Sequence, residues 1–151
     1  MRSDIPPRAA WLWALRENVI LHAGPSVQMN WISTGGVTGT SRRAGLRGAD
    51  QMAAYGSSVM VAPDKILTLA GGTVYTGVPG SRQSHLISVS GSGFNNMKAK
   101  VTRVGDLTYG RGYCNAVVLP TGAVVVIGGQ SILKPFSDSN AILAAELWEP
   151  N

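Results

Sequence analysis

An all-β fold is predicted for this chain of 151 residues by three features of its sequence. Residues 55–72 and 113–129 repeat one pattern: a leading tyrosine, two aliphatic runs around a turn, and a closing pair of glycines. The period of roughly 57 residues suits a four-stranded unit with long loops and is too long for leucine-rich or helical repeats. Glycine is abundant, with 19 residues, and only 14% of the residues are charged, which suits an extensive buried sheet assembly. The chain is therefore predicted to be a partial β-propeller.

The first predicted blade spans residues 11–54 and follows an N-terminal segment of residues 1–10. Two short strands are expected within residues 11–21, on either side of a turn at residues 16–18. A helix is the competing interpretation, but the run leads into Ala23-Gly24-Pro25-Ser26, which would end either element. Residues 28–31 then predict an outer strand, and a long loop is expected from there to about residue 51.

The second predicted blade, residues 55–112, is the most complete of the three. Its first two strands form the hairpin of residues 55–72, and a loop follows from residue 73 to residue 84. Alternating and β-branched residues predict a third strand at 85–89 and an outer strand near 98–104.

The third predicted blade, residues 113–151, repeats the hairpin around Pro120-Thr121-Gly122, a tight-turn sequence. A loop is expected at 131–140 and one more strand at 145–148. The unbroken apolar runs of the hairpin predict strands that neighbouring blades cover on both faces. The sequence thus provides about two and a half blades where closed propellers need 4 to 8, so we expect an incomplete propeller with uncovered edges.

Charge and cysteine content exclude several classes of protein. The net charge of +5 is modest, and its densest cluster, residues 41–48, lies in a predicted glycine-rich loop without aromatic residues. Such a segment is typical of a solvated or structurally paired loop, and a nucleic-acid partner is not expected. A single cysteine allows no intrachain disulfide, and no Cys/His spacing resembles a zinc site. No apolar run is long enough to span a membrane, and no secretory signal is visible.

A set of ordered motifs between residues 11 and 150 resembles the kelch-type propeller of galactose oxidase-like and glyoxal oxidase-like copper radical oxidases, a fungal family. The motifs that carry the resemblance in the last third of the chain are Arg111-Gly112-Tyr113-Cys114, Gly128-Gly129-Gln130, Pro135-Phe136-Ser137-Asp138 and Glu146-Leu147-Trp148-Glu149-Pro150. Supporting matches are Ala23-Gly24-Pro25-Ser26, Met29-Asn30-Trp31 and Lys65-Ile66-Leu67-Thr68.

The resemblance implies an activity for the family and a limit for this chain. Its members oxidise a primary alcohol or an aldehyde with dioxygen and release hydrogen peroxide, using copper held by two histidines and two tyrosines, one of them cross-linked to a cysteine. None of these ligand positions matches a residue of this chain, and Cys114 stands where relatives often carry a histidine. We therefore expect no catalytic residue, no metal ligand and no activity in the chain alone. The family also implies secretion, a small alcohol, aldehyde or carbohydrate substrate, and closure of the propeller by the remaining blades or another chain.

Three aromatic residues are candidates for substrate binding by the same resemblance: Phe136, Tyr113 and Tyr75. The alternative for each is ordinary packing against the sheets. An Arg-Ser-Asp sequence at residues 2–4 resembles a substrate-contacting motif of the family, but its spacing to the first strand is too long to count. Packing roles are expected for the two histidines, for the four tryptophans and for Cys114, a small buried hydrophobe.

Two other hypotheses remain open at the level of sequence. One is a non-catalytic kelch-type interaction or carbohydrate-binding module that oligomerises to cover its open edges. The other is a relative that keeps the propeller but has lost its copper chemistry.

Overall fold

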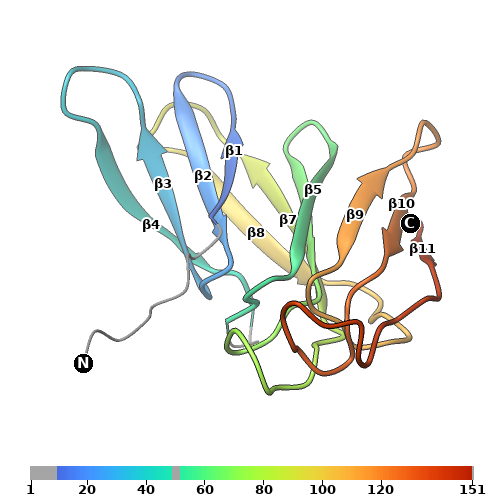
Figure 1. Cartoon of the computed structure of the whole chain (residues 1–151). Coiled ribbons are helices and arrows are strands. Elements are labelled where there is room, and N and C mark those ends of the chain that lie inside the picture. The colour runs from blue at the N-terminus through green and yellow to red at the C-terminus, as the bar shows by residue number, and fades with distance from the viewer. Residues whose placement is uncertain (1–9, 49–51, 151) are drawn as a thin grey trace, which may run out of the picture.

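The computed structural model describes residues 10–48 and 52–150, and every regular element in this part of the chain is a β-strand. The strands form three antiparallel sheets that follow one another along the chain and stand side by side in Figure 1. The first sheet contains β1 (Trp11–Ala14), β2 (Val19–Gly24), β3 (Gln28–Ser33) and β4 (Thr40–Leu46); the second contains β5 (Ser57–Ala62), β6 (Lys65–Leu69), β7 (Ser84–Ser90) and β8 (Lys98–Arg103); the third contains β9 (Asn115–Val118), β10 (Val124–Ile127) and β11 (Glu146–Trp148). Two four-stranded sheets and one three-stranded sheet confirm the predicted all-β partial propeller of about two and a half blades.

The sheets pack face to face, as consecutive propeller blades do. The first strands β5 and β9 lie beside each other, and so do the last strands β4 and β8. Leu21 and Trp31 of the first sheet meet Ile66 of β6 in one core, whereas Leu67 of β6 packs with Val124 of β10 in another. Because successive side chains of a strand point to opposite faces, β6 contributes to both cores and the second sheet is covered on both sides.

The repeated hairpin is real, but its glycines align differently from the prediction. The sequence suggests that Gly71 and Gly72 correspond to Gly128 and Gly129. The backbone instead matches Ala70 with Gly128, at φ 62° and 66°, and Gly71 with Gly129, at φ 94° and 90°. Left-handed backbone at these two positions turns the chain out of the second strand, and the alanine in the earlier copy conceals the equivalence.

The predicted long loop after β3 is wrong, because β4 (Thr40–Leu46) completes the first sheet there. Its arginines explain how so polar a segment is held in a strand. The Arg42 guanidinium donates hydrogen bonds to the carbonyl oxygens of Phe94 and Met97 in the second sheet's β7–β8 connection. Arg47, directly after β4, is buried and donates to the carbonyl oxygen of Pro25 at 2.8 Å. The basic segment is therefore structurally paired, as predicted, although it is a strand.

The third hairpin departs from the prediction that its strands are covered on both faces. Val124 and Val126 of β10 are buried against the second sheet. On the opposite face, Val117, Ile127 and Leu147 are exposed at 50%, 43% and 57%. Local sequence predicts the strands correctly here, but the neighbour that would cover this face is not formed by the described residues.

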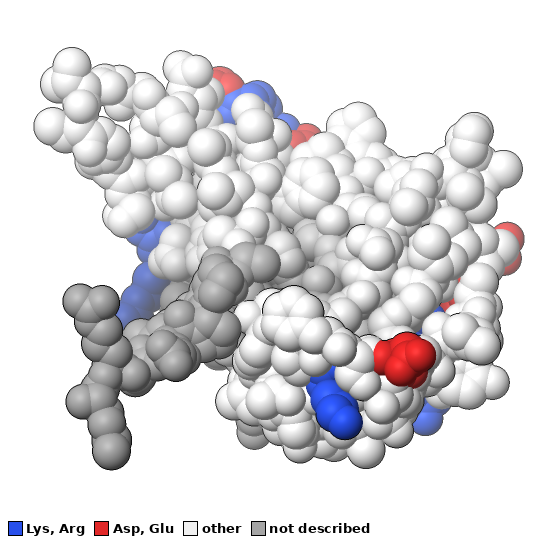
Figure 2. Space-filling model, in the orientation of Figure 1, with Lys and Arg blue, Asp and Glu red and all other residues white. Residues whose placement is uncertain are grey.

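In the orientation of Figure 1, charged side chains appear only in small separate groups on a mostly uncharged face (Figure 2). The described residues contain no helix that is long and apolar enough to cross a membrane. The N-terminal sequence at residues 2–4 lies outside the described residues.

Candidate functional site

Two long loops meet at one end of the sheets, the lower end in Figure 1. One follows β6 and the other follows β10, and they pair through backbone hydrogen bonds. The Gly77 N–H donates to the Leu133 carbonyl oxygen at 2.7 Å, and the Leu133 N–H donates to the Val78 carbonyl oxygen at 2.9 Å. The Leu133 side chain is fully buried between the loops. Loops fixed in this way can hold side chains in a defined arrangement.

Three tyrosines gather where these loops join the sheets. Tyr55 and Tyr113 each precede the first strand of a sheet, and the Tyr113 N–H donates to the Tyr55 carbonyl oxygen at 2.7 Å. The Tyr55 ring lies 5.0 Å from the Tyr75 ring and 4.9 Å from the Tyr113 ring, measured between centroids. Tyr75 and Tyr113 are 6.2 Å apart and nearly perpendicular. These distances and tilts are those of favourable aromatic contacts.

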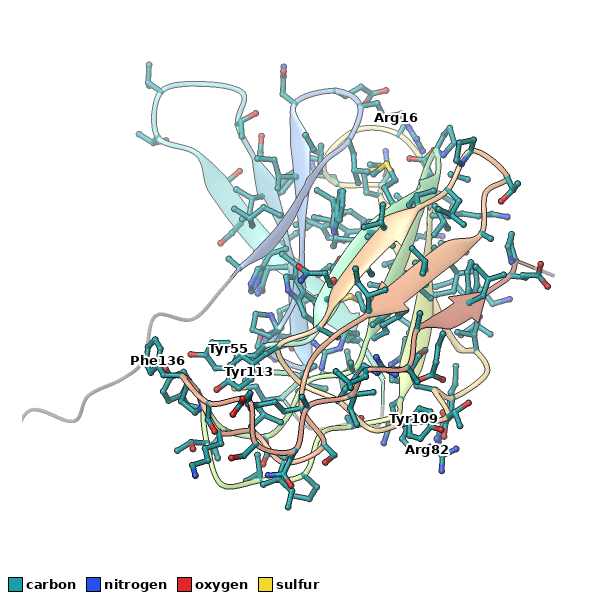
Figure 3. The ribbon with its side chains drawn as sticks, turned by 45° about the vertical axis from the view of Figure 1, so that its right-hand side comes forward. Arg16, Tyr55, Arg82, Tyr109, Tyr113 and Phe136 are labelled. Carbon is teal, nitrogen blue, oxygen red and sulfur yellow. The ribbon has the colours of Figure 1, made fainter. Side chains whose placement is uncertain are left out.

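Left-handed backbone is concentrated around this cluster. Tyr55 and Tyr113 both have φ of 59°, and Phe136 has φ of 57°. Bulky side chains rarely adopt this conformation, which costs of order 1–3 kcal/mol for each residue and is more frequent at functional sites. Figure 3 shows Tyr55 and Tyr113 close together with Phe136 beside them at the outer end of the loop.

The aromatic residues line a pocket of about 470 Å³ at this end of the sheets. Its lining residues are Tyr55, Tyr75, Tyr113, Gly129, Gln130, Lys134, Pro135, Phe136, Ser137 and Ala141. The Phe136 side chain is wholly exposed, so it does not pack against a sheet. An exposed aromatic ring at the rim of an aromatic pocket is available to contact a bound molecule.

The polar groups of the pocket are mostly engaged with the protein itself. The Gln130 side chain donates from Nε2 to the Ser137 carbonyl oxygen and accepts at Oε1 from the Lys134 backbone N–H, the latter at 2.7 Å. The Tyr113 hydroxyl donates to the Tyr75 carbonyl oxygen. Burial, with the neighbouring Tyr75 and Tyr55, raises the pKa of Tyr113 to about 12. Burial and Tyr75 also raise the pKa of Tyr55, so both phenols are neutral at ordinary pH.

A buried ion pair anchors the backbone beside the pocket. The Arg111 side chain is completely buried, and one of its nitrogens lies 2.6 Å from Glu146 Oε1 on β11. The same guanidinium donates to the carbonyl oxygens of Gly128 and Ala144. Burial acts to raise the pKa of Glu146, but hydrogen bonds from Thr108, the Tyr109 N–H and Arg111 outweigh it and lower that pKa.

Cys114, which follows Tyr113 in the chain, is a packing residue, as predicted. It is 7% exposed and belongs to the core between the second and third sheets. Burial is the main cause that raises the pKa of its thiol to about 11, with Glu146 adding to the increase and Arg111 opposing it. A neutral, enclosed thiol of this kind is a poor nucleophile and a poor metal ligand.

The described residues do not fit a copper site. Copper in proteins favours imidazole and thiolate donors grouped around an open position, but His22 lies on β2 and His85 on β7, in different sheets. His85 is buried with its ring against Gly48. No group of three or more His, Cys, Asp or Glu side chains within 10–48 and 52–150 is placed to hold a metal ion.

The structure brings together the three predicted site residues, Phe136, Tyr113 and Tyr75, around one pocket. Sequence reasoning missed Tyr55 and Lys134, which also line it. The sequence repeat could have identified Tyr55, because Tyr55 leads the earlier hairpin as Tyr113 leads the later one.

The chain is similar in sequence and in structure to fungal oxidases. No protein-family model matches the chain. Galactose oxidase from Gibberella zeae, strain PH-1, is 32% identical over 146 residues, which cover 93% of this chain and 21% of that protein. A second galactose oxidase from Gibberella zeae matches with the same identity and coverage. The chain thus spans about a fifth of the length of these relatives.

Several solved structures are similar to the chain, and two of them are a fungal oxidase and YjhT. A novel fungal alcohol oxidase with catalytic diversity among the AA5 family, in complex with copper, is 39% identical with a TM-score of 0.87, covering 93% of this chain and 29% of that one. The structure of YjhT, at 13% identity and a TM-score of 0.61, covers 96% of this chain and 44% of that one, and shows the fold alone. The sequence and structural matches converge, and the chain belongs to the galactose oxidase-like family of copper radical oxidases, matching part of the propeller of its members.

Proposed function

We propose that this chain is a propeller segment of an enzyme that oxidises a primary alcohol, an aldehyde or a carbohydrate with dioxygen and releases hydrogen peroxide. The observation that carries the proposal is the aromatic pocket formed by Tyr75, Tyr113 and Phe136. It lies in the segment that resembles a copper alcohol oxidase over 93% of the chain. Strained aromatic residues around an open pocket favour a site that binds a small molecule.

In this proposal the chain supplies part of the substrate-binding wall and no part of the copper site. The donor set argues for that division, because the two histidines lie in different sheets and Cys114 is enclosed in the core. Copper, a cross-linked tyrosine and the redox chemistry would come from other parts of the protein, so we assign no catalytic step to this chain. The chain by itself is expected to be inactive.

The same proposal accounts for the uncovered face of the third sheet. Val117, Ile127 and Leu147 form an apolar surface there, opposite the face that packs against the second sheet. We infer that a further blade, from the remaining part of the polypeptide or from another chain, covers this surface. Secretion is likewise proposed from family membership alone.

Two proteins test the proposed function together. The first is the purified 151-residue chain supplied with copper(II) and assayed for peroxide release from galactose and benzyl alcohol; no copper-dependent release is expected. The second is Gibberella zeae galactose oxidase in which this chain replaces the matching segment, and it is expected to release peroxide. The same chimaera carrying Phe136→Ala is expected to fold and bind copper but to need more substrate. Copper-dependent turnover by the chain alone would contradict the proposal.

A non-catalytic binding module is the second candidate, because Tyr55, Tyr75, Tyr113 and Phe136 already line an aromatic pocket within this chain. A thermal melt followed by near-ultraviolet circular dichroism separates the candidates, since four tryptophans report fixed packing. A cooperative transition of the isolated chain favours the module. A weak signal without a cooperative transition favours a segment that depends on the rest of an oxidase.

A further inference from the structure

The pocket is lined mainly by aromatic residues and by few charged ones, and this composition determines what it can bind. Four of its lining residues are aromatic, and Pro135 adds another flat apolar surface. Within the lining there is no aspartate or glutamate, and the one cationic side chain is Lys134. The pocket therefore offers ring faces and edges over most of its wall.

Its hydrogen-bonding groups are largely committed within the protein. The Gln130 amide uses its nitrogen on the Ser137 carbonyl oxygen and its oxygen on the Lys134 N–H. The Tyr113 hydroxyl is donated to the Tyr75 carbonyl oxygen, and the Ser137 hydroxyl accepts the Ser139 N–H. A polyol loses hydrogen bonds to water when it enters such a pocket and recovers few of them, which costs binding energy.

An aromatic ring loses far fewer hydrogen bonds to water than a polyol does. It gives up little hydration and can stack on, or meet edge to face, the tyrosine rings that stand 4.9 to 6.2 Å apart and are already tilted by 47° to 87°. The rings are prepared for such contacts because Tyr55 and Tyr113 are fixed by left-handed backbone and by the hydrogen bond between them. Phe136 at the rim, wholly exposed, can close over a bound ring.

We propose that this pocket selects a planar aromatic ring, so that the substrates of the site are aromatic primary alcohols or aldehydes in preference to sugars. The inference rests on the proposed function in one respect: it takes the pocket as the place where substrate is held. Tyr55 is then a specificity-determining residue, because its ring is in contact with both the Tyr75 ring and the Tyr113 ring.

The test is equilibrium binding to the 151-residue chain, measured by saturation-transfer NMR and by titration. The probes are benzyl alcohol, cyclohexylmethanol and galactose, which separate ring stacking from general apolarity and from sugar recognition. Benzyl alcohol is expected to bind about three- to tenfold more tightly than cyclohexylmethanol, the contribution of one or two aromatic contacts, and galactose more weakly than either.

Variants locate the effect. Phe136→Ala changes a wholly exposed side chain and leaves the fold intact, and it is expected to weaken benzyl alcohol binding about threefold. Tyr75→Leu is expected to weaken it further. Tyr109→Leu is the matched control, because Tyr109 is a half-exposed tyrosine outside the pocket, and Figure 3 places it far from Tyr55 and Tyr113.

Three outcomes would overturn the inference: no detectable binding of benzyl alcohol, equal or tighter binding of galactose, or an equal loss of affinity in the Tyr109→Leu control. Because the readout is binding and not turnover, it is independent of the oxidase assay. An aromatic preference without peroxide release from the chimaera would support this inference and count against the proposed oxidase.

Discussion

The second and third hairpins share one sequence pattern but differ in burial. Residues 66–69 of β6 are all buried, whereas in β10 Val124 and Val126 are buried and Ile127 is exposed at 43%. Apart from Lys65 and Thr68 of β6, both strands are apolar, and both end in the same left-handed turn. The difference lies in their surroundings, because a packed sheet covers each face of β6 and only one face of β10. A continuous apolar run thus predicts that both faces of a strand can be buried, but it does not show whether the residues of this chain cover both faces.

The largest effect is expected where the third sheet is anchored, at Arg111. Replacing it by methionine leaves the Glu146 carboxylate, whose side chain is only 13% exposed, without its cationic partner, and removing one member of a buried pair costs about 3–5 kcal/mol of unfolding free energy. Urea denaturation measures the loss.

The matched control is Arg103→Met. Arg103 pairs with Asp106 at 2.8 Å, but the two side chains are 58% and 34% exposed, so a loss of about 0–1 kcal/mol is expected. Equal losses for the two arginines would show that the Arg111 pair does not anchor the third sheet.

The next effect compares matched positions of the two hairpins. Leu67 is fully buried between sheets, and its equivalent Val125 is half-buried on the open face. We expect Leu67→Ala to cost about 2–5 kcal/mol, the usual cost of truncating a core leucine, and Val125→Ala to cost less than about 1.5 kcal/mol. Thermal and urea unfolding of the two variants measure the difference. Similar losses would mean that the open face of β10 is covered in solution.

A smaller effect is expected from pH, through Glu146. Its pKa in the folded chain is below the usual 4.5, since the hydrogen bonds that favour the carboxylate outweigh burial. A lowered pKa adds stability that is fully present above the pKa of the unfolded chain and is lost as pH falls through the folded pKa. The unfolding free energy should therefore decline below about pH 4.5. In Glu146→Gln that part of the decline should disappear, and an unchanged pH profile would contradict the assignment.

Most strands could be predicted because their signals are local. Aliphatic runs and turn residues mark the hairpins of residues 55–72 and 113–129, and β1 and β2 flank the predicted turn. The sequence does not predict β4 because glycine and alanine are depleted in strands and its arginines interrupt any apolar pattern. Pairing with β3 and the hydrogen bonds of Arg42 hold this segment extended.

The site was predictable only through resemblance. Tyr75, Tyr113 and Phe136 have no spacing that would bring them together, and nothing in the local sequence indicates left-handed backbone at a tyrosine or phenylalanine. Tyr55 joins them through the hydrogen bond between its carbonyl oxygen and the Tyr113 N–H, a contact between two repeats. Such contacts depend on how blades pack, and composition or periodicity carries no information about them.

The smallest effect is expected on the open face, where Ile127 is the equivalent of the buried Leu69. Ile127→Thr keeps a β-branched residue and removes apolar surface that is already in water, so the unfolding free energy should change by no more than about 0.5 kcal/mol. Binding of a hydrophobic dye to the chain should fall, since Val117, Ile127 and Leu147 form one exposed patch. In a longer protein whose next blade covers this face, the same substitution should instead cost about as much as a core truncation, because Ile127 is then buried. A negligible loss in the chain and a large one in the longer protein would establish that the difference between the two hairpins is one of neighbours alone.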